Sequence, residues 1–157
     1  MKTPRLPFLL SPLLIAAVLP LAAPAQAPTA APAPKTAMKT SMVFDWNALV
    51  PKEFPYGRRR PVFDGPSVKM DGLECHITTL NPGQISGPAH THTDEEVTIV
   101  NEGTVEVSIN DRKQTIGKGS VFYFAPADTV GIRNVGQTPA TYTVIKLTVQ
   151  SVPVATK

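Results

Sequence analysis

Short β-type runs separated by turn-forming residues constrain the fold of this chain more than any other feature. The runs are rich in valine, isoleucine, threonine and aromatic residues, and glycine, proline, asparagine and aspartate stand between them. They cover residues 73–80, 96–102, 104–110, 113–116, 120–124, 131–135 and 140–149. About seven or eight short strands at this spacing predict an all-β sandwich or barrel. One short helical turn is expected at residues 44–50, with Asp45 as its N-cap and Pro51 at its end.

Alternation within the runs predicts which side chains face the core. Val105 and Val107 alternate with polar residues, as in a strand with one buried and one solvated face. The same period places the neighbours Cys75 and His76 on opposite faces. We expect Cys75 to be a small buried apolar residue rather than a nucleophile. For His76, a hydrogen-bonded strand histidine and a site residue both remain open.

The N-terminus has the layout of a targeting segment. Lys2 and Arg5 precede an apolar run that ends in Ala23-Pro24-Ala25, which predicts a signal peptide over residues 1–25 and a periplasmic or secreted protein. A membrane anchor is the alternative, but prolines bracket the apolar run and leave it too short to span a bilayer. We therefore expect no membrane span in the mature form.

Composition divides the rest of the chain into three segments. Residues 26–41 form an Ala/Pro-rich linker, residues 42–67 an N-terminal arm, and residues 68–150 the β-domain. The roughly 115 residues from Met42 onward can bury one core of ordinary size.

Charge and cysteine content exclude several classes of protein. The chain has 15 basic and 12 acidic residues and one cysteine, which can form neither an internal disulfide nor a zinc finger. The positive charges are scattered apart from Arg58, Arg59 and Arg60, so we expect no nucleic-acid partner. That run is expected in a solvated arm, with an anion-binding role as the weaker alternative.

The stretch around residues 90–103 carries the chemistry. In extended backbone His90, His92 and Glu96 project from one face, and two imidazoles with one carboxylate form the facial triad typical of non-haem iron sites. Such a set can equally hold manganese, nickel or zinc. Thr98 and Val100 continue the same face. The alternative is a surface loop with two chance histidines and a solvated acidic run.

These residues resemble the first motif of the cupins. That motif runs Gly, five residues, His-x-His, three or four residues, Glu, six residues, Gly. His90, His92, Glu96 and Gly103 match it, whereas Gly83 lies one residue too far upstream. The resemblance covers roughly residues 68–149. It implies a cupin double-stranded β-helix, a jelly-roll barrel of two facing antiparallel sheets, and a homodimer. Burial of the arm from Val43 to Phe63 against the neighbour would explain the apolar and aromatic content of that arm.

The second cupin motif is only partly present, because its metal-binding histidine is missing. The segment from Gly119 through Pro126 to Asn134 resembles it, but Val130 or Gly131 stands where the family has its last metal-binding histidine. Neither side chain can coordinate a metal. We therefore expect either a weaker site with one more open position or the loss of metal altogether. His76 is the only other histidine that could substitute.

Two hypotheses of different class follow. The first is an exported enzyme that binds one divalent metal ion through His90, His92 and Glu96 and acts on a small molecule, in a dioxygenase-like or isomerase-like reaction; its catalytic residues stay unassigned. The second is a metal-free periplasmic cupin that binds a small ligand or sugar. Under either hypothesis the candidate pocket lining is His76, Thr98, Val100, Phe122, Phe124 and Val130.

Overall fold

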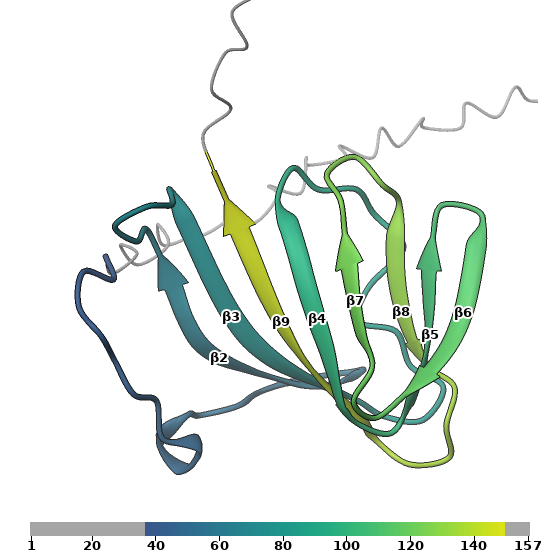
Figure 1. Cartoon of the computed structure of the whole chain (residues 1–157). Helices are drawn as coiled ribbons and strands as arrows, with labels where there is room; N and C mark the ends of the chain where they lie inside the picture. The colour runs from purple at the N-terminus through teal and green to yellow at the C-terminus, as the bar shows by residue number, and fades with distance from the viewer. Residues whose placement is uncertain (1–36, 150–157) are drawn as a thin grey trace, which may run out of the picture. The chain divides into compact units, whose positions relative to one another are not determined.

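The computed structural model describes residues 37–149, and nearly all regular structure within them is β (Figure 1). The predicted signal peptide and residues 26–36 of the linker lie outside the described residues. The elements are η1 (Trp46–Ala48), β1 (Lys52–Phe54), β2 (Gly57–Gly65), β3 (Gly72–Leu80), β4 (Glu95–Glu102), β5 (Thr104–Ile109), β6 (Arg112–Gly117), β7 (Val121–Phe124), β8 (Val130–Asn134) and β9 (Ala140–Thr148).

The strands form two antiparallel sheets. The larger has the order β1-β2-β3-β9-β4-β7 and the smaller the order β6-β5-β8. In Figure 1 the larger sheet curves from β2 to β7, and β8, β5 and β6 follow beside it. All pairings within the two sheets are antiparallel. The predicted all-β jelly-roll class is confirmed.

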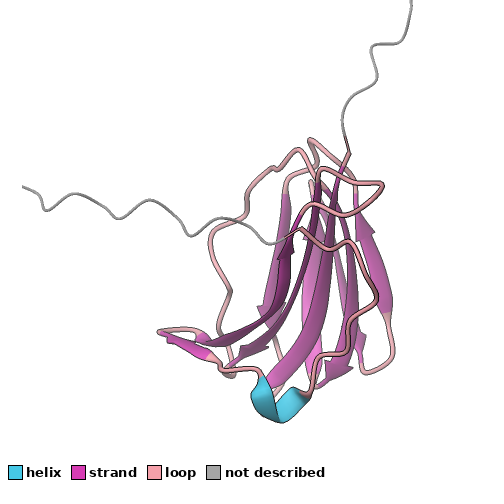
Figure 2. Ribbon diagram, turned by 90° about the vertical axis from the view of Figure 1, so that its left-hand side faces the viewer, coloured by secondary structure: helices cyan, strands magenta, loops and turns pink. Residues whose placement is uncertain are grey.

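The seven strands predicted from the sequence correspond to β3–β9, with each end within one residue of its predicted place. The helical turn is also present as a 3₁₀ turn, coloured cyan in Figure 2. The carboxylate of Asp45 accepts a hydrogen bond from the backbone N–H of Asn47 at 3.0 Å, as an N-cap does. Period-two alternation and turn chemistry were therefore sufficient for this part of the chain.

The N-terminal arm contains two strands that the sequence did not predict. The nine-residue strand β2 pairs with β3 along its length, with one irregularity between Pro61 and Phe63. β1 covers only residues 52–54, so the edge of β2 beyond Arg59 has no partner strand among the described residues. Pro61 lies on this free edge, where its missing N–H costs no hydrogen bond of the sheet. The β structure therefore begins at Lys52, before the boundary expected at residue 68.

One apolar cluster joins the two sheets. Leu80, Val100 and Val144 from the larger sheet pack in it with Val105 and Val107 from the smaller sheet, which confirms the predicted inward face of β5. Cys75 is buried, and this burial raises the pKa of its thiol. The prediction of an unreactive buried cysteine agrees with both findings. Among the described residues no helix is long and apolar enough to cross a membrane.

Candidate functional site

A small cavity of about 60 Å³ opens on the inner face of the larger sheet. Three strands supply most of its polar lining because β9 lies between β3 and β4. His76 comes from β3, Tyr142 and Lys146 from β9, and Glu96 from β4. This volume holds a few water-sized groups and is far below that of a drug-sized ligand pocket.

His90 reaches the cavity from the loop before β4 because its backbone bridges to β8. The N–H of His90 donates to the carbonyl of Val130 at 3.1 Å, and the N–H of Val130 donates back at 2.9 Å. Val130 is 2% exposed and lines the cavity. The position directly opposite His90 is therefore occupied by an apolar side chain. Gly131 also borders the cavity but has no side chain to offer.

Both histidines of the His-x-His pair have one ring nitrogen tied to the backbone. Nδ1 of His90 lies 3.0 Å from the carbonyl of Pro88, and Nδ1 of His92 lies 2.8 Å from that of Asp94. A carbonyl only accepts, so Nδ1 carries the proton, and in the neutral ring Nε2 keeps its lone pair. The two ring centroids are 5.8 Å apart. Metal-binding histidines are commonly oriented by such a bond.

Glu96 is buried, with three neighbours at its carboxylate. The hydroxyl of Thr98 donates to Oε1 at 3.0 Å, while Nε2 of His92 and Nζ of Lys146 each lie 3.9 Å from Oε2. Nε2 of His92 is buried and has no hydrogen-bond partner in the part of the chain that the structure describes. Two imidazole nitrogens and a carboxylate are donors that suit a divalent transition metal. Within residues 37–149, however, no three His, Cys, Asp or Glu side chains are close enough to form a ready-made metal centre.

His76 points into the same cavity and has its own carboxylate partner. Its Nδ1 lies 2.8 Å from Oε1 of Glu74. This hydrogen bond lowers the pKa of Glu74, against the opposing effect of partial burial. His76 is therefore a hydrogen-bonded histidine of a strand and at the same time a residue of the cavity lining.

Only some of the other residues predicted to line the pocket do line the cavity. Phe124 and Val130 line the cavity. Thr98, Val100 and Phe122 do not. Thr98 is fully buried and reaches the site only through its bond to Glu96, and Val100 packs within the apolar core. Phe122 lines a different cavity, together with side chains of β5 and β6.

Two cations of the site were missed by sequence reasoning. Arg59 was expected in a solvated arm but lines the cavity, and its buried Nε has no hydrogen-bond partner between residues 37 and 149. Lys146 also lines the cavity, because it has the same parity in β9 as the buried Tyr142 and Val144. Burial raises the pKa of Tyr142 to about 12, so its phenol is neutral and able to donate. Arg59 is placed on this face by its pairing with the buried Thr78 of β3, which no local pattern in the sequence shows.

The sequence family described as "Cupin domain" matches residues 76–146, the segment from His76 on β3 to Lys146 on β9. The chain is a member of the cupin superfamily. Among curated protein sequences, none matches it.

Solved structures agree with the cupin fold. An RmlC-like cupin from Shewanella frigidimarina has a TM-score of 0.56 and 17% identity, over 71% of this chain and 95% of its own. KdgF from a Halomonas species has a TM-score of 0.57 and 16% identity, over 68% and 94%. A variant of oxalate decarboxylase from Bacillus subtilis has a TM-score of 0.54 and 17% identity, over 70% of this cupin and 31% of its own chain.

Proposed function

We propose that this cupin is a metal-dependent enzyme that acts on a small molecule, with one divalent ion held by His90, His92 and Glu96. The observation that carries the proposal is the pair of Nδ1 bonds to the carbonyls of Pro88 and Asp94. They leave the Nε2 lone pairs of both rings free of those bonds; that of His92 lies 3.9 Å from the buried Glu96 carboxylate and has no hydrogen-bond partner within residues 37–149. Iron, manganese, nickel and zinc all accept this donor set.

When bound, the metal would supply Lewis-acid polarisation of an oxygen-containing substrate or, in the case of iron, activation of oxygen. The chain's own residues do the rest. Thr98 fixes the orientation of the Glu96 carboxylate through its hydrogen bond, and the neutral phenol of Tyr142 can donate to a bound substrate. Val130 contributes no ligand, so one coordination position more than in the usual cupin set stays open for substrate.

Metal content measured by mass spectrometry tests the proposal on full-chain protein purified without an affinity tag or added metal. We expect near-stoichiometric metal in the wild type and loss of metal in His90→Ala/His92→Ala. Glu102→Ala is the control and should retain the metal, because this exposed carboxylate does not line the cavity. Metal absent from the wild type, and not recovered on adding iron, manganese, nickel or zinc, would overturn the enzyme proposal.

A metal-free cupin that binds a small ligand or sugar is the second candidate. The contact of 3.9 Å between Lys146 and Glu96 favours it, because an ammonium already balances the carboxylate that a metal would use. The apolar Val130 opposite His90 favours it as well. Under this alternative a chelator leaves ligand binding and thermal stability unchanged, whereas a metalloprotein loses stability when its metal is removed.

Export and self-association also remain proposals. We propose that residues 1–25 direct the chain to the periplasm or outside the cell, which N-terminal sequencing of the protein recovered there would test. We propose a homodimer in which the N-terminal arm contributes to the interface. Exposed Val43 and Trp46 give that arm apolar surface to bury. Sedimentation that shows only monomer at micromolar concentration would remove the dimer.

A further inference from the structure

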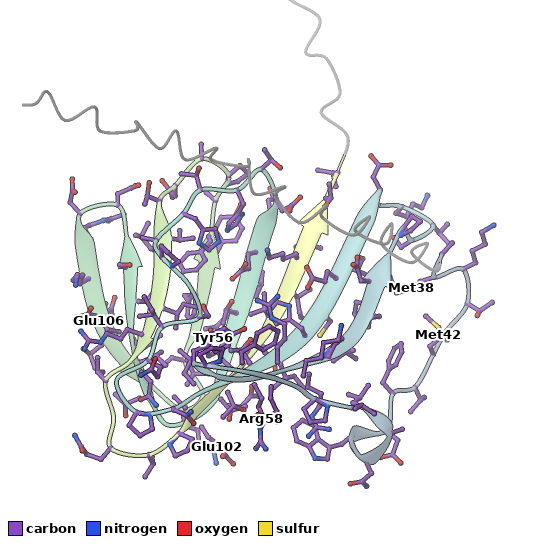
Figure 3. All side chains as sticks on the ribbon, turned by 180° about the vertical axis from the view of Figure 1, so that it is seen from behind. Met38, Met42, Tyr56, Arg58, Glu102 and Glu106 are labelled. Atoms are coloured by element: carbon purple, nitrogen blue, oxygen red, sulfur yellow. The ribbon has the colours of Figure 1, made fainter. Side chains whose placement is uncertain are left out.

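The three consecutive arginines of β2 have three different environments. Arg58 is exposed, and Figure 3 shows it at the lower edge of the ribbon. Arg60 lies over the ring of Trp46, with 4.1 Å between guanidinium carbon and ring centroid, and donates to the carbonyl of Leu49. Arg59 alone lines the cavity that holds His90 and Glu96. One cation of the run is therefore directed at the site.

The guanidinium of Arg59 has unused hydrogen-bonding capacity there. Its Nε is buried and has no partner among the described residues. A buried donor without an acceptor is costly, and a guanidinium always carries its charge. An acceptor delivered by a ligand would remove that cost.

The neighbouring carboxylates are already engaged. Glu96 is contacted by Thr98 and faces Lys146, and Glu74 accepts from His76 at 2.8 Å. Among the charged residues that line the cavity, Arg59 and Lys146 stand against Glu96, and Glu74, which is hydrogen-bonded to His76, also interacts electrostatically with both cations. The unpartnered Nε of Arg59, rather than a net charge, therefore leaves a place for an acceptor on a ligand.

We propose that Arg59 binds a carboxylate group, so that the substrate of this site is a small carboxylic acid. The planar fork of a guanidinium matches the two oxygens of a carboxylate, and such a bidentate pair fixes orientation as well as charge. The cavity volume of about 60 Å³ limits the enclosed part of the ligand to a few heavy atoms. The inference deepens the proposed function, on which it rests, by naming the substrate class of the same site.

Acetate and the neutral, near-isosteric acetamide are the probes, titrated into the full chain and followed by NMR chemical shifts. The titrations are run on chelator-treated protein and again on metal-loaded protein, because a metal could itself bind acetate. We expect acetate to bind at least tenfold more tightly than acetamide in both forms. Arg59→Gln should weaken acetate binding at least tenfold, while the matched control Arg58→Gln changes it less than twofold.

Two further measurements separate the possible failures. Arg59→Lys keeps the charge without the fork, so it should bind acetate with intermediate affinity, and circular dichroism verifies that both Arg59 variants fold. Metal content should be the same in Arg59→Gln and the wild type, because Arg59 is no ligand. Equal affinity for acetate and acetamide would overturn the carboxylate assignment, and so would an equal loss of acetate affinity in Arg59→Gln and Arg58→Gln. Neither result would affect the metal proposal. Inorganic phosphate binding more tightly than acetate through Arg59 would overturn it too.

Discussion

Nζ of Lys146 lies 3.9 Å from Oε2 of Glu96, and the Cα partners of Lys146 on the two neighbouring strands are both glutamates. Glu74 stands opposite it on β3 and Glu96 on β4. The ammonium of the central strand thus lies in one row with two carboxylates. The ammonium of Lys146 and the proposed metal ion would therefore compete for the same carboxylate, that of Glu96.

Replacement of Lys146 by methionine should have opposite effects on the metal-free fold and on metal affinity. The side chain of Glu96 is only 9% exposed, so removal of its cation leaves a poorly compensated buried charge. We expect Lys146→Met to lower the free energy of unfolding of metal-free protein by about 1–3 kcal/mol in urea titrations. Metal affinity should rise, because no ammonium competes for the carboxylate.

Lys113→Met is the control for that experiment. Lys113 forms a closer ion pair with Glu106, at 2.9 Å, but its side chain is 66% exposed. Exposed pairs contribute about 0–1 kcal/mol, so this variant should change neither stability nor metal affinity appreciably. Equal effects of the two substitutions would show that Lys146 does not act through Glu96.

Glu74 should make the stability of the fold depend on pH in the acid range. Its pKa is lowered in the folded state by the hydrogen bond from His76. A lowered pKa gives stability that is fully present above the unfolded value, near 4.5, and is lost as the pH falls through the folded value. As the pH is lowered from about 6 to 3, the urea concentration at the unfolding midpoint should therefore decrease less steeply for Glu74→Gln than for the wild type. A substitution of the exposed Glu102 should keep the wild-type slope.

The sequence predicted the fold where its periodicity was clean. β5 alternates apolar and polar residues and is bounded by turns, so its ends and its inward face followed directly. β2 was missed because three arginines and Pro61 interrupt any alternation. Its pairing with β3 and the cation–π contact of Arg60 hold it in the sheet, and both are tertiary interactions that a local pattern does not contain.

Only part of the candidate site could be predicted from the sequence. His90 and Glu96, which were predicted to share a face in extended backbone, both line the cavity, whereas His92 lies 3.9 Å from Glu96 and is not among the lining residues. Arg59 and Lys146 lie far from them in the sequence and reach the cavity only through the strand order β2-β3-β9-β4. Nonlocal strand pairing therefore decided which charges surround the predicted ligands.

Gly103 of the first motif is required by both its backbone and its surroundings. Its φ is +81°, and an added Cβ would lie 2.7 Å from Cα of Ala140 on β9. Gly83 has a similar φ of +77°, but its Cβ would meet nothing within 4 Å. Gly83→Ala should therefore cost about 1–2 kcal/mol of unfolding free energy from backbone strain alone. Gly103→Ala should cost a further 1–3 kcal/mol, roughly, from the clash. Equal urea midpoints for the two variants would refute this account.

Introduction of histidine at position 130 should supply the ligand that the second motif lacks. Val130 is buried, lines the cavity and is bridged to His90 by two backbone hydrogen bonds, so a side chain here projects toward the proposed metal ligands. We expect Val130→His to bind zinc or iron at least tenfold more tightly than the wild type. An increase of this size corresponds to about 1.4 kcal/mol and should appear as a larger rise in melting temperature on metal addition.

Gly131→His tests the other alignment of the same motif. A Cβ at Gly131 would lie 2.9 Å from Oγ of Ser108 and 3.7 Å from Cβ of Ala89, so a side chain here starts toward those residues and should gain no affinity for metal. Val130→Ala controls for the loss of the apolar side chain and should leave metal affinity near that of the wild type. Tighter metal binding by Gly131→His than by Val130→His would reverse the assignment of the vacant ligand position. No gain in either variant would argue that the ion, if bound, lies away from β8.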